Sequence, residues 1–135
     1  MILADTGFWI ALANRKDRHH ARAKAVATRV KGPFVATWPV LTETCHLMMR
    51  LGVDAEIRFV EAAARGALKI FDLRPAHLPR IIELLHKYRD LPMDLADASL
   101  VVAAEELGSG RILSTDERDF RTYRWKNHKP FTNLL

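Results

Sequence analysis

The stretch LPMDLADASLVVAAEELG, residues 91–108, predicts a helix that carries two carboxylates in its first turn. Pro92 ends the segment before it, and Gly108 supplies a C-terminal stop. An apolar stripe recurs at helical spacing: Leu95, Ala98, Val102, Ala103 and Leu107. Asp94 and Asp97 are three residues apart, so they share a helix face next to this stripe. Carboxylates beside a buried face require a compensating group.

The rest of the chain alternates short apolar runs with helical patterns. Strands are predicted within residues 1–5, 34–38, 68–73 and 111–116, and helices within 7–15, 19–30, 39–52, 53–68 and 74–91. Asp54 is the expected N-cap of the fourth of these helices, and the segment after residue 116 reads as one helical turn and a less regular tail. Parallel neighbouring strands need crossover connections, which helices supply. The sequence therefore predicts a three-layer α/β/α sandwich with a mainly parallel central sheet.

Length and composition favour one soluble globular domain. The 135 residues are 49% hydrophobic and 27% charged, so we expect a single domain over 1–135. No apolar run approaches the roughly 20 residues of a membrane span, and Asp5 interrupts what would be a signal's apolar region. A lone Cys45 forms no internal disulfide. These features predict a cytoplasmic protein without membrane association.

Five acids fall where the predicted strands end or the following helices begin. They are Asp5, Glu43, Asp94, Asp97 and Asp116. Ligands of open α/β sheets bind beyond the carboxyl ends of the strands, so we expect all five at one edge. Carboxylates packed together repel one another, and a hard divalent cation such as Mg²⁺ or Mn²⁺ resolves that repulsion. Such a cation can position a water and stabilise the leaving oxygen of a phosphodiester.

The charge balance fits a nucleic-acid partner. The chain has 21 Lys and Arg against 16 Asp and Glu, a formal net charge of +5. Outside the five clustered acids, the same 21 basic residues face only 11 acidic ones. A basic body with an acidic pocket suits a phosphodiester chain, because the body attracts the backbone and the pocket acts on one phosphate.

Each acid taken alone also fits a structural role. Asp5 and Asp94 are well placed to cap helices, Glu43 fits a solvated helix position, and Asp116 fits a surface turn. The basic stretch at 15–24 fits either a grip on RNA phosphates or a solvated helix face. The joint pattern of the acids favours the metal site.

Several apolar residues are open to a functional or a packing role. Trp38 and Trp125 fit base stacking or packing. Met48, Met49 and Phe59 fit either a surface for a dimer or partner protein, or the core.

Four segments together resemble the motifs of a PIN domain, most closely those of the VapC-type toxins of bacterial toxin–antitoxin pairs. They are ILADTGFWIAL (2–12), VLTETCHLM (40–48), DLADASLVVAAEELG (94–108) and ILSTDERDF (112–120). Their order and spacing cover almost the whole chain. The resemblance implies an Mg²⁺- or Mn²⁺-dependent endoribonuclease that cleaves single-stranded RNA. It also implies a homodimer and inhibition by a small antitoxin protein.

The resemblance also implies roles for individual residues. The family's acidic quartet corresponds to Asp5, Glu43, Asp97 and Asp116, with Asp94 as an added outer ligand. Thr6 and Thr115 match hydroxyl positions that orient a carboxylate or a water, and Asp119 is expected to be peripheral.

Two other functions stay open at the level of sequence. The chain fits a non-catalytic RNA- or partner-binding module, and it also fits a DNA nuclease, because phosphate chemistry does not identify the sugar. A phosphate-accepting receiver domain is disfavoured: it needs an acid pair after the first strand and a Lys late in the sheet, and neither is in place.

Overall fold

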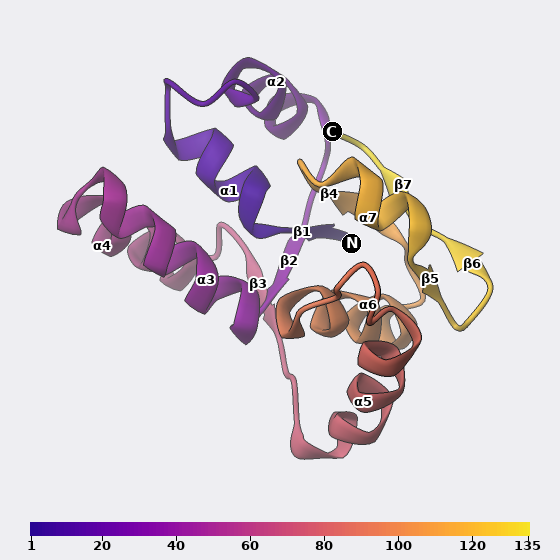
Figure 1. The fold of residues 1–135 in the computed structure, drawn as a ribbon. Coiled ribbons are helices and arrows are strands. Elements are labelled where there is room, and N and C mark those ends of the chain that lie inside the picture. The colour runs from indigo at the N-terminus through magenta and orange to yellow at the C-terminus, as the bar shows by residue number, and fades with distance from the viewer.

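A five-stranded parallel sheet forms the centre of the computed structural model, which describes all 135 residues (Figure 1). The strand order is β3-β2-β1-β4-β7, and every pairing within it is parallel. The strands are β1 (Ile2–Ala4), β2 (Phe34–Thr37), β3 (Lys69–Phe71), β4 (Arg111–Leu113) and β7 (Thr132–Asn133). β5 (Arg124–Trp125) and β6 (Lys129–Pro130) form a separate antiparallel hairpin.

Helices cover both faces of the sheet. They are α1 (Thr6–Ala13), α2 (His20–Arg29), α3 (Trp38–Met48), α4 (Val53–Ala64), α5 (Leu78–Lys87), α6 (Leu95–Leu107) and α7 (Glu117–Thr122), with short 3₁₀ turns at Met49–Leu51 and Pro75–His77. α5 and α6 lie on one side of the strands, and α1 and α2 lie on the other (Figure 1). The predicted three-layer α/β/α sandwich is confirmed. No helix has the length and apolar character that a membrane crossing requires.

The helix α6 is buried on nearly every side. Its buried residues are Ala96, Ala98, Ser99, Leu100, Val101, Val102, Ala103 and Ala104. The predicted stripe was therefore too narrow, because α6 packs against the sheet, α3, α5 and the β5–β6 hairpin together. The assignment of Leu95 to the stripe was wrong: at the first position of α6 its side chain is 48% exposed.

Two local predictions were wrong for reasons of turn chemistry and strand length. Gly52, with φ 117°, precedes α4 without a side-chain cap, and Asp54 lies within the first turn of that helix. The tail forms the fifth strand, β7, whose two residues are too few to show an alternating pattern.

An aromatic cluster joins α1, β2 and α4. The ring of Trp9 makes edge or tilted contacts with Phe8, Phe34 and Phe59 at centroid separations of 5.1–6.0 Å. Met48 and Phe59 are buried and belong to the core, whereas Met49 is exposed. Of the three residues weighed for a partner surface, only Met49 is thus exposed.

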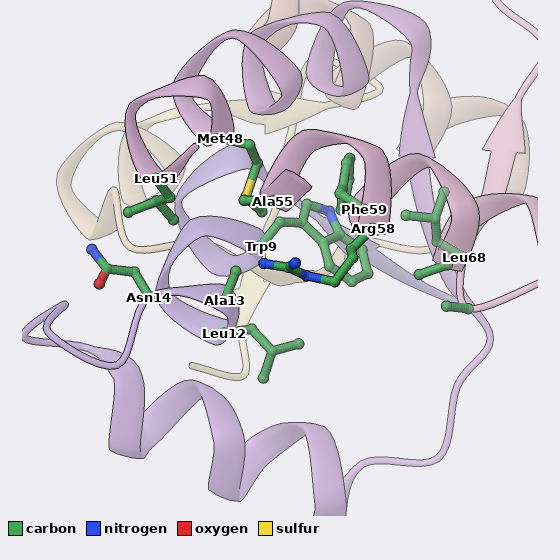
Figure 2. A pocket seen from close by; sticks show the side chains of 12 residues that line it. Trp9, Leu12, Ala13, Asn14, Met48, Leu51, Ala55, Arg58, Phe59 and Leu68 are labelled. Atoms are coloured by element: carbon green, nitrogen blue, oxygen red, sulfur yellow. The ribbon is translucent and has the colours of Figure 1, made fainter. Parts of the chain in front are cut away.

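A mainly apolar hollow of about 490 Å³ lies between α1, the end of α3 and α4 (Figure 2). Trp9, Met48 and Phe59 line it, together with Leu51, which is exposed. Arg58 also lines it and is its one charged residue. This hollow is mainly apolar, in contrast to the carboxylate pocket described next.

Candidate active site

The acids gather at the point where the strand order of the sheet reverses. β1 pairs with β2 on one side and with β4 on the other. Asp5 directly follows β1, and Asp116 follows β4 by three residues. Crevices at such switch points, beyond the carboxyl ends of the strands, are the usual binding sites of open α/β sheets. The topology therefore places these two acids where a ligand is expected.

Seven carboxylates line one pocket of about 390 Å³ at this edge. They are Asp5, Asp17, Glu43, Asp94, Asp97, Asp116 and Asp119. The structure thus brings together all five acids predicted from the sequence. It also adds Asp17, from the loop between α1 and α2, and Asp119, which was expected to be peripheral.

Asp5 is buried and held at both carboxylate oxygens. Its Oδ1 accepts the backbone N–H of Thr6 at 2.7 Å, and its Oδ2 accepts the hydroxyl of Ser114 at 3.0 Å. Ala4 of β1 pairs with Leu113 of β4, so the residues that follow them, Asp5 and Ser114, lie side by side. Burial raises the pKa of Asp5 to about 6, opposed by these two hydrogen bonds and supported by the charges of Glu43 and Asp94.

Asp97 stands in the first turn of α6, where Tyr123 donates its phenol hydrogen to Oδ2 of Asp97 at 2.9 Å. The backbone N–H of Asp97 donates to Oδ1 of Asp94 at 2.8 Å, so Asp94 caps the helix. Burial, together with the neighbouring charges of Asp94 and Asp5, raises the pKa of Asp97 to about 7, and the Tyr123 hydroxyl opposes this rise. Burial also raises the pKa of Tyr123. Tyr123 therefore stays protonated and acts as a hydrogen-bond donor that favours the charged form of Asp97.

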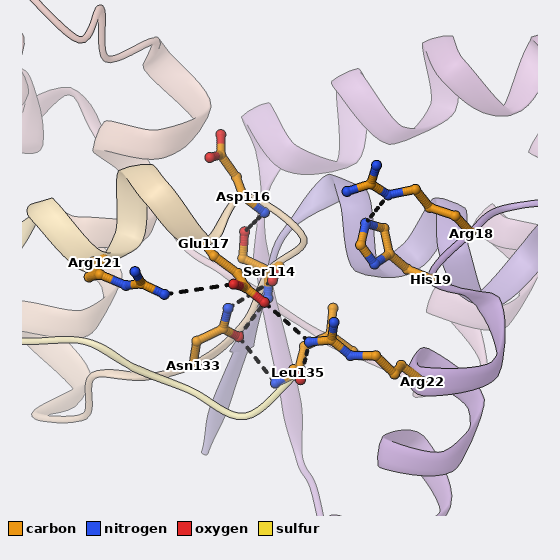
Figure 3. A network of polar contacts seen from close by, with 9 residues as sticks. All are labelled: Arg18, His19, Arg22, Ser114, Asp116, Glu117, Arg121, Asn133 and Leu135. Atoms are coloured by element: carbon orange, nitrogen blue, oxygen red, sulfur yellow. Dashed lines mark hydrogen bonds and ion pairs between the residues drawn. The ribbon is translucent and has the colours of Figure 1, made fainter.

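The segment after β4 is fixed by the tail of the chain (Figure 3). Asn133, in β7, accepts the backbone N–H of Ser114 at 3.2 Å and donates to the Ser114 carbonyl at 2.8 Å. The Ser114 hydroxyl oxygen in turn accepts the backbone N–H of Asp116 at 3.0 Å. Ser114 consequently links the two acids that flank the switch point, Asp5 and Asp116.

The two predicted threonines, Thr6 and Thr115, both line the pocket. The hydroxyl of Thr6 donates to the Val40 carbonyl at 3.5 Å, so it orients no carboxylate. A Cβ added to Gly7 would lie 1.9 Å from the Thr115 hydroxyl oxygen, so only glycine allows this approach. The hydroxyl that holds Asp5 belongs to Ser114 instead.

Helix capping and pocket lining occur in the same residues. Asp5, Asp94 and Asp116 each occupy the N-cap of a helix, respectively α1, α6 and α7, and each accepts a backbone N–H there. The capping role weighed for Asp5 and Asp94 is therefore confirmed and coexists with their place in the pocket, whereas Asp116, weighed as a surface-turn residue, also caps a helix. The N-termini of α1 and α6 also bring partial positive charge toward these carboxylates.

The donor set of the pocket suits a hard divalent cation. Its lining contains seven carboxylates and two threonines, and no Lys, Arg, His or Cys. Oxygen donors alone are what Mg²⁺ and Mn²⁺ prefer, and no basic side chain in the lining balances the negative charge. No group of three or more His, Cys, Asp or Glu side chains is arranged as a ready ligand cluster. The residues fit such a cation, and which of them bind it stays a prediction.

Sequence reasoning missed three residues of this site: Ser114, Tyr123 and Asp17. Ser114 lies within the predicted strand 111–116 and directly follows β4, which pairs with β1, so strand register could have indicated it. Tyr123 and Asp17 carry no such signal, because a tail of unknown path and a basic loop bring them to the pocket.

Comparisons with known proteins agree with this architecture. The family model described as PIN domain matches residues 2–126. Ribonuclease VapC26 of Mycobacterium tuberculosis is 27% identical over 124 residues, which cover 91% of this chain and 92% of that protein. The crystal structure of Mycobacterium tuberculosis VapC20, described as a Sarcin-Ricin loop cleaving toxin, superposes with a TM-score of 0.81 at 21% identity. It covers 87% of this chain and 92% of VapC20. With the family model spanning nearly the whole fold and the acids gathered at its switch point, this chain belongs to the PIN domain family.

Proposed function

We propose that this protein is a metal-dependent endoribonuclease that hydrolyses phosphodiester bonds of single-stranded RNA and acts as the toxin of a toxin–antitoxin pair. The observation that carries the proposal is the pocket of seven carboxylates without a basic residue, on a chain whose net charge is +5. A pocket of this kind repels a phosphate unless a cation bridges the two. The basic remainder attracts a polyanion to the same molecule.

Asp5, Asp97, Glu43 and Asp116 would hold the cation, with Asp94 as an outer ligand. A divalent cation bound there supplies charge neutralisation for the attacked phosphate and acidifies a water. The Thr6 N–H and the Ser114 hydroxyl orient Asp5, and the Tyr123 hydroxyl favours the charged form of Asp97. One of the carboxylates then accepts the proton of the attacking water.

Relatives support RNA as the substrate. VapC26 is named a ribonuclease, and VapC20 is described as a toxin that cleaves the sarcin–ricin loop. The family, the acidic pocket and the basic net charge all fit the same chemistry in this chain.

Cleavage of labelled oligonucleotides tests the proposal directly. Purified, partner-free protein is incubated with a panel of single-stranded RNA and DNA in Mg²⁺, Mn²⁺ or EDTA, beside Asp5→Asn and Asp97→Asn. Asp54→Asn, at an exposed position in α4, is the matched control. We expect RNA cleavage that requires the divalent cation, disappears in both pocket variants and persists in Asp54→Asn.

Other outcomes select the other functions. Cleavage of DNA alone would identify a DNA nuclease. An intact panel under every condition, with RNA bound equally by wild type and pocket variants, would leave a non-catalytic RNA-binding module. Circular dichroism of each variant separates loss of activity from loss of fold.

The proposal includes a small antitoxin protein, a homodimer and a cytoplasmic location. The apolar hollow of Figure 2, with the exposed Met49 and Leu51 nearby, offers a surface for a partner protein away from the carboxylates. Co-expression with the neighbouring reading frame, followed by size-exclusion chromatography, tests for both a complex and a dimer.

A further inference from the structure

Trp38 is the one tryptophan that the fold leaves on the surface. Its side chain is 56% exposed, whereas Trp9 and Trp125 are buried. The base-stacking role weighed for Trp125 is therefore excluded, because its ring packs in the core and its Nε1 donates to the Pro130 carbonyl. Trp38 is the first residue of α3, directly after β2, and so lies at the same edge of the sheet as the carboxylate pocket.

Trp38 borders a hollow of about 690 Å³ that adjoins the carboxylate pocket. Its lining includes Trp38, Thr42, Glu43, His46, Asp94 and Leu95. Glu43 and Asp94 line both spaces, so these two carboxylates form the boundary between them. A ligand that reaches across Glu43 and Asp94 occupies both spaces at once.

The lining of this hollow suits a nucleobase better than a phosphate. Glu43 and Asp94 are its carboxylates and no Lys or Arg lines it, so a backbone phosphate would be repelled there. Trp38 and Leu95 offer exposed apolar surface on which a planar base can stack. His46 is an exposed polar residue that can bond to a base edge, and the hydroxyl oxygen of Thr42, whose hydrogen is donated to the Trp38 carbonyl at 3.0 Å, can accept from one.

The covalent structure of RNA fits a phosphate in the carboxylate pocket and a base in the neighbouring hollow. A base is joined to its phosphate through one ribose, so a phosphate in the carboxylate pocket leaves an adjacent base close to the boundary residues Glu43 and Asp94. Only an unpaired base can leave its stack and lie on an aromatic side chain. Because every base has a π-face, such stacking selects single-stranded substrate and tolerates sequence variation.

We propose that the hollow bordered by Trp38 is a nucleobase-binding subsite, in which one unpaired base next to the scissile phosphate stacks on the Trp38 indole. The inference rests on the proposed action on RNA and adds a determinant of single-strand preference to it. Trp38 binds substrate and takes no part in the chemistry.

Binding of a short labelled RNA, measured by fluorescence anisotropy in the Asp97→Asn background with Mg²⁺, tests the subsite without cleavage. We expect Trp38→Ala to weaken binding about 5- to 150-fold, the range for loss of one stacked base. Trp38→Phe should restore most of the affinity, because a smaller aromatic ring still stacks. Val53→Ala, at an exposed apolar position in α4, is the control and should bind as the background does.

A set of oligonucleotides with a single abasic position locates the stacked base. One abasic position should weaken binding as much as Trp38→Ala does, and should cause no further loss in Trp38→Ala. Losses that add at every position would overturn the subsite, because the indole and the base would then act independently.

The outcomes separate this inference from the proposed function. Metal-dependent RNA cleavage with Trp38→Ala binding as tightly as its background would refute the subsite and leave the nuclease intact. Trp38-dependent binding without any cleavage would refute the nuclease and leave Trp38 as a base-stacking residue of a non-catalytic RNA-binding module. A change in sedimentation velocity of Trp38→Ala, with RNA affinity unchanged, would show that a second copy of the chain covers this face and would refute the subsite. If no variant binds RNA, both the nucleobase-binding subsite and the proposed function are refuted.

Discussion

Replacing Asp5 with asparagine should stabilise the protein at neutral pH when no divalent cation is present. The pKa of Asp5 is raised from 3.8 to about 6 in the folded state. The folded protein therefore binds more protons than the unfolded chain between about pH 4 and pH 6, and its stability falls as the pH rises through that window. Asparagine carries no charge, caps α1 equally well, and can bond to both Thr6 and Ser114.

The magnitude follows from the pKa shift. A shift from 3.8 to about 6 corresponds to roughly 3 kcal/mol at most, at 1.36 kcal/mol per pKa unit. For a chain of 135 residues this equals a melting temperature about 10 °C higher for Asp5→Asn at pH 8 in EDTA. The difference should shrink as the pH falls and be nearly absent at pH 4.

Calorimetry of wild type, Asp5→Asn and Asp54→Asn at several pH values is the assay. Mg²⁺ should raise the melting temperature of wild type more than that of Asp5→Asn, because a ligand that binds the folded state stabilises it. The reasoning is refuted by an Asp5→Asn protein no more stable than wild type at pH 8 in EDTA. It is equally refuted by a gap between the two proteins that does not change with pH.

Three further predictions concern the surroundings of the pocket. Tyr123→Phe removes the hydroxyl that donates to Asp97 and so should raise the pKa of Asp97. The acidic limb of the pH profile of RNA cleavage should then move to higher pH. An unmoved limb would mean that this hydrogen bond does not tune the pKa of Asp97. Gly7→Ala places a Cβ 1.9 Å from the Thr115 hydroxyl oxygen and should lower the free energy of unfolding, measured by urea titration, by about 1–3 kcal/mol. The double variant with Thr115→Gly should recover part of this loss. An unchanged transition midpoint in Gly7→Ala would contradict the prediction. Arg15 lies in the exposed basic loop that also carries the pocket carboxylate Asp17. Arg15→Ala should weaken RNA binding across sequences and reduce the salt dependence of binding by about one phosphate contact. Equal salt slopes for the two proteins would place the RNA elsewhere.

The order of most strands and helices could be predicted from the sequence because most of them carry a local signal. Apolar runs that end in acids predicted β1 and β4, and Gly108, the predicted helix stop, follows the last residue of α6 with φ 67°. β7 was missed because two residues carry no periodicity and its pairing with β4 is set by the path of the tail. Leu95 was misplaced because periodicity does not say where a neighbouring element stops covering a helix.

The sequence by itself determined the fold class and the five predicted acids, because strand ends and helix starts fix where those side chains emerge. Only the tertiary structure decided which groups hold them. Ser114 reaches Asp5 through the register of two strands far apart in the chain, and Tyr123 reaches Asp97 from the tail. The exposure of Trp38 and the burial of Trp125 were likewise decided by packing. A side chain's local sequence sets its direction on its own element, whereas its burial, its partners and its pKa depend on elements that only the folded chain brings together.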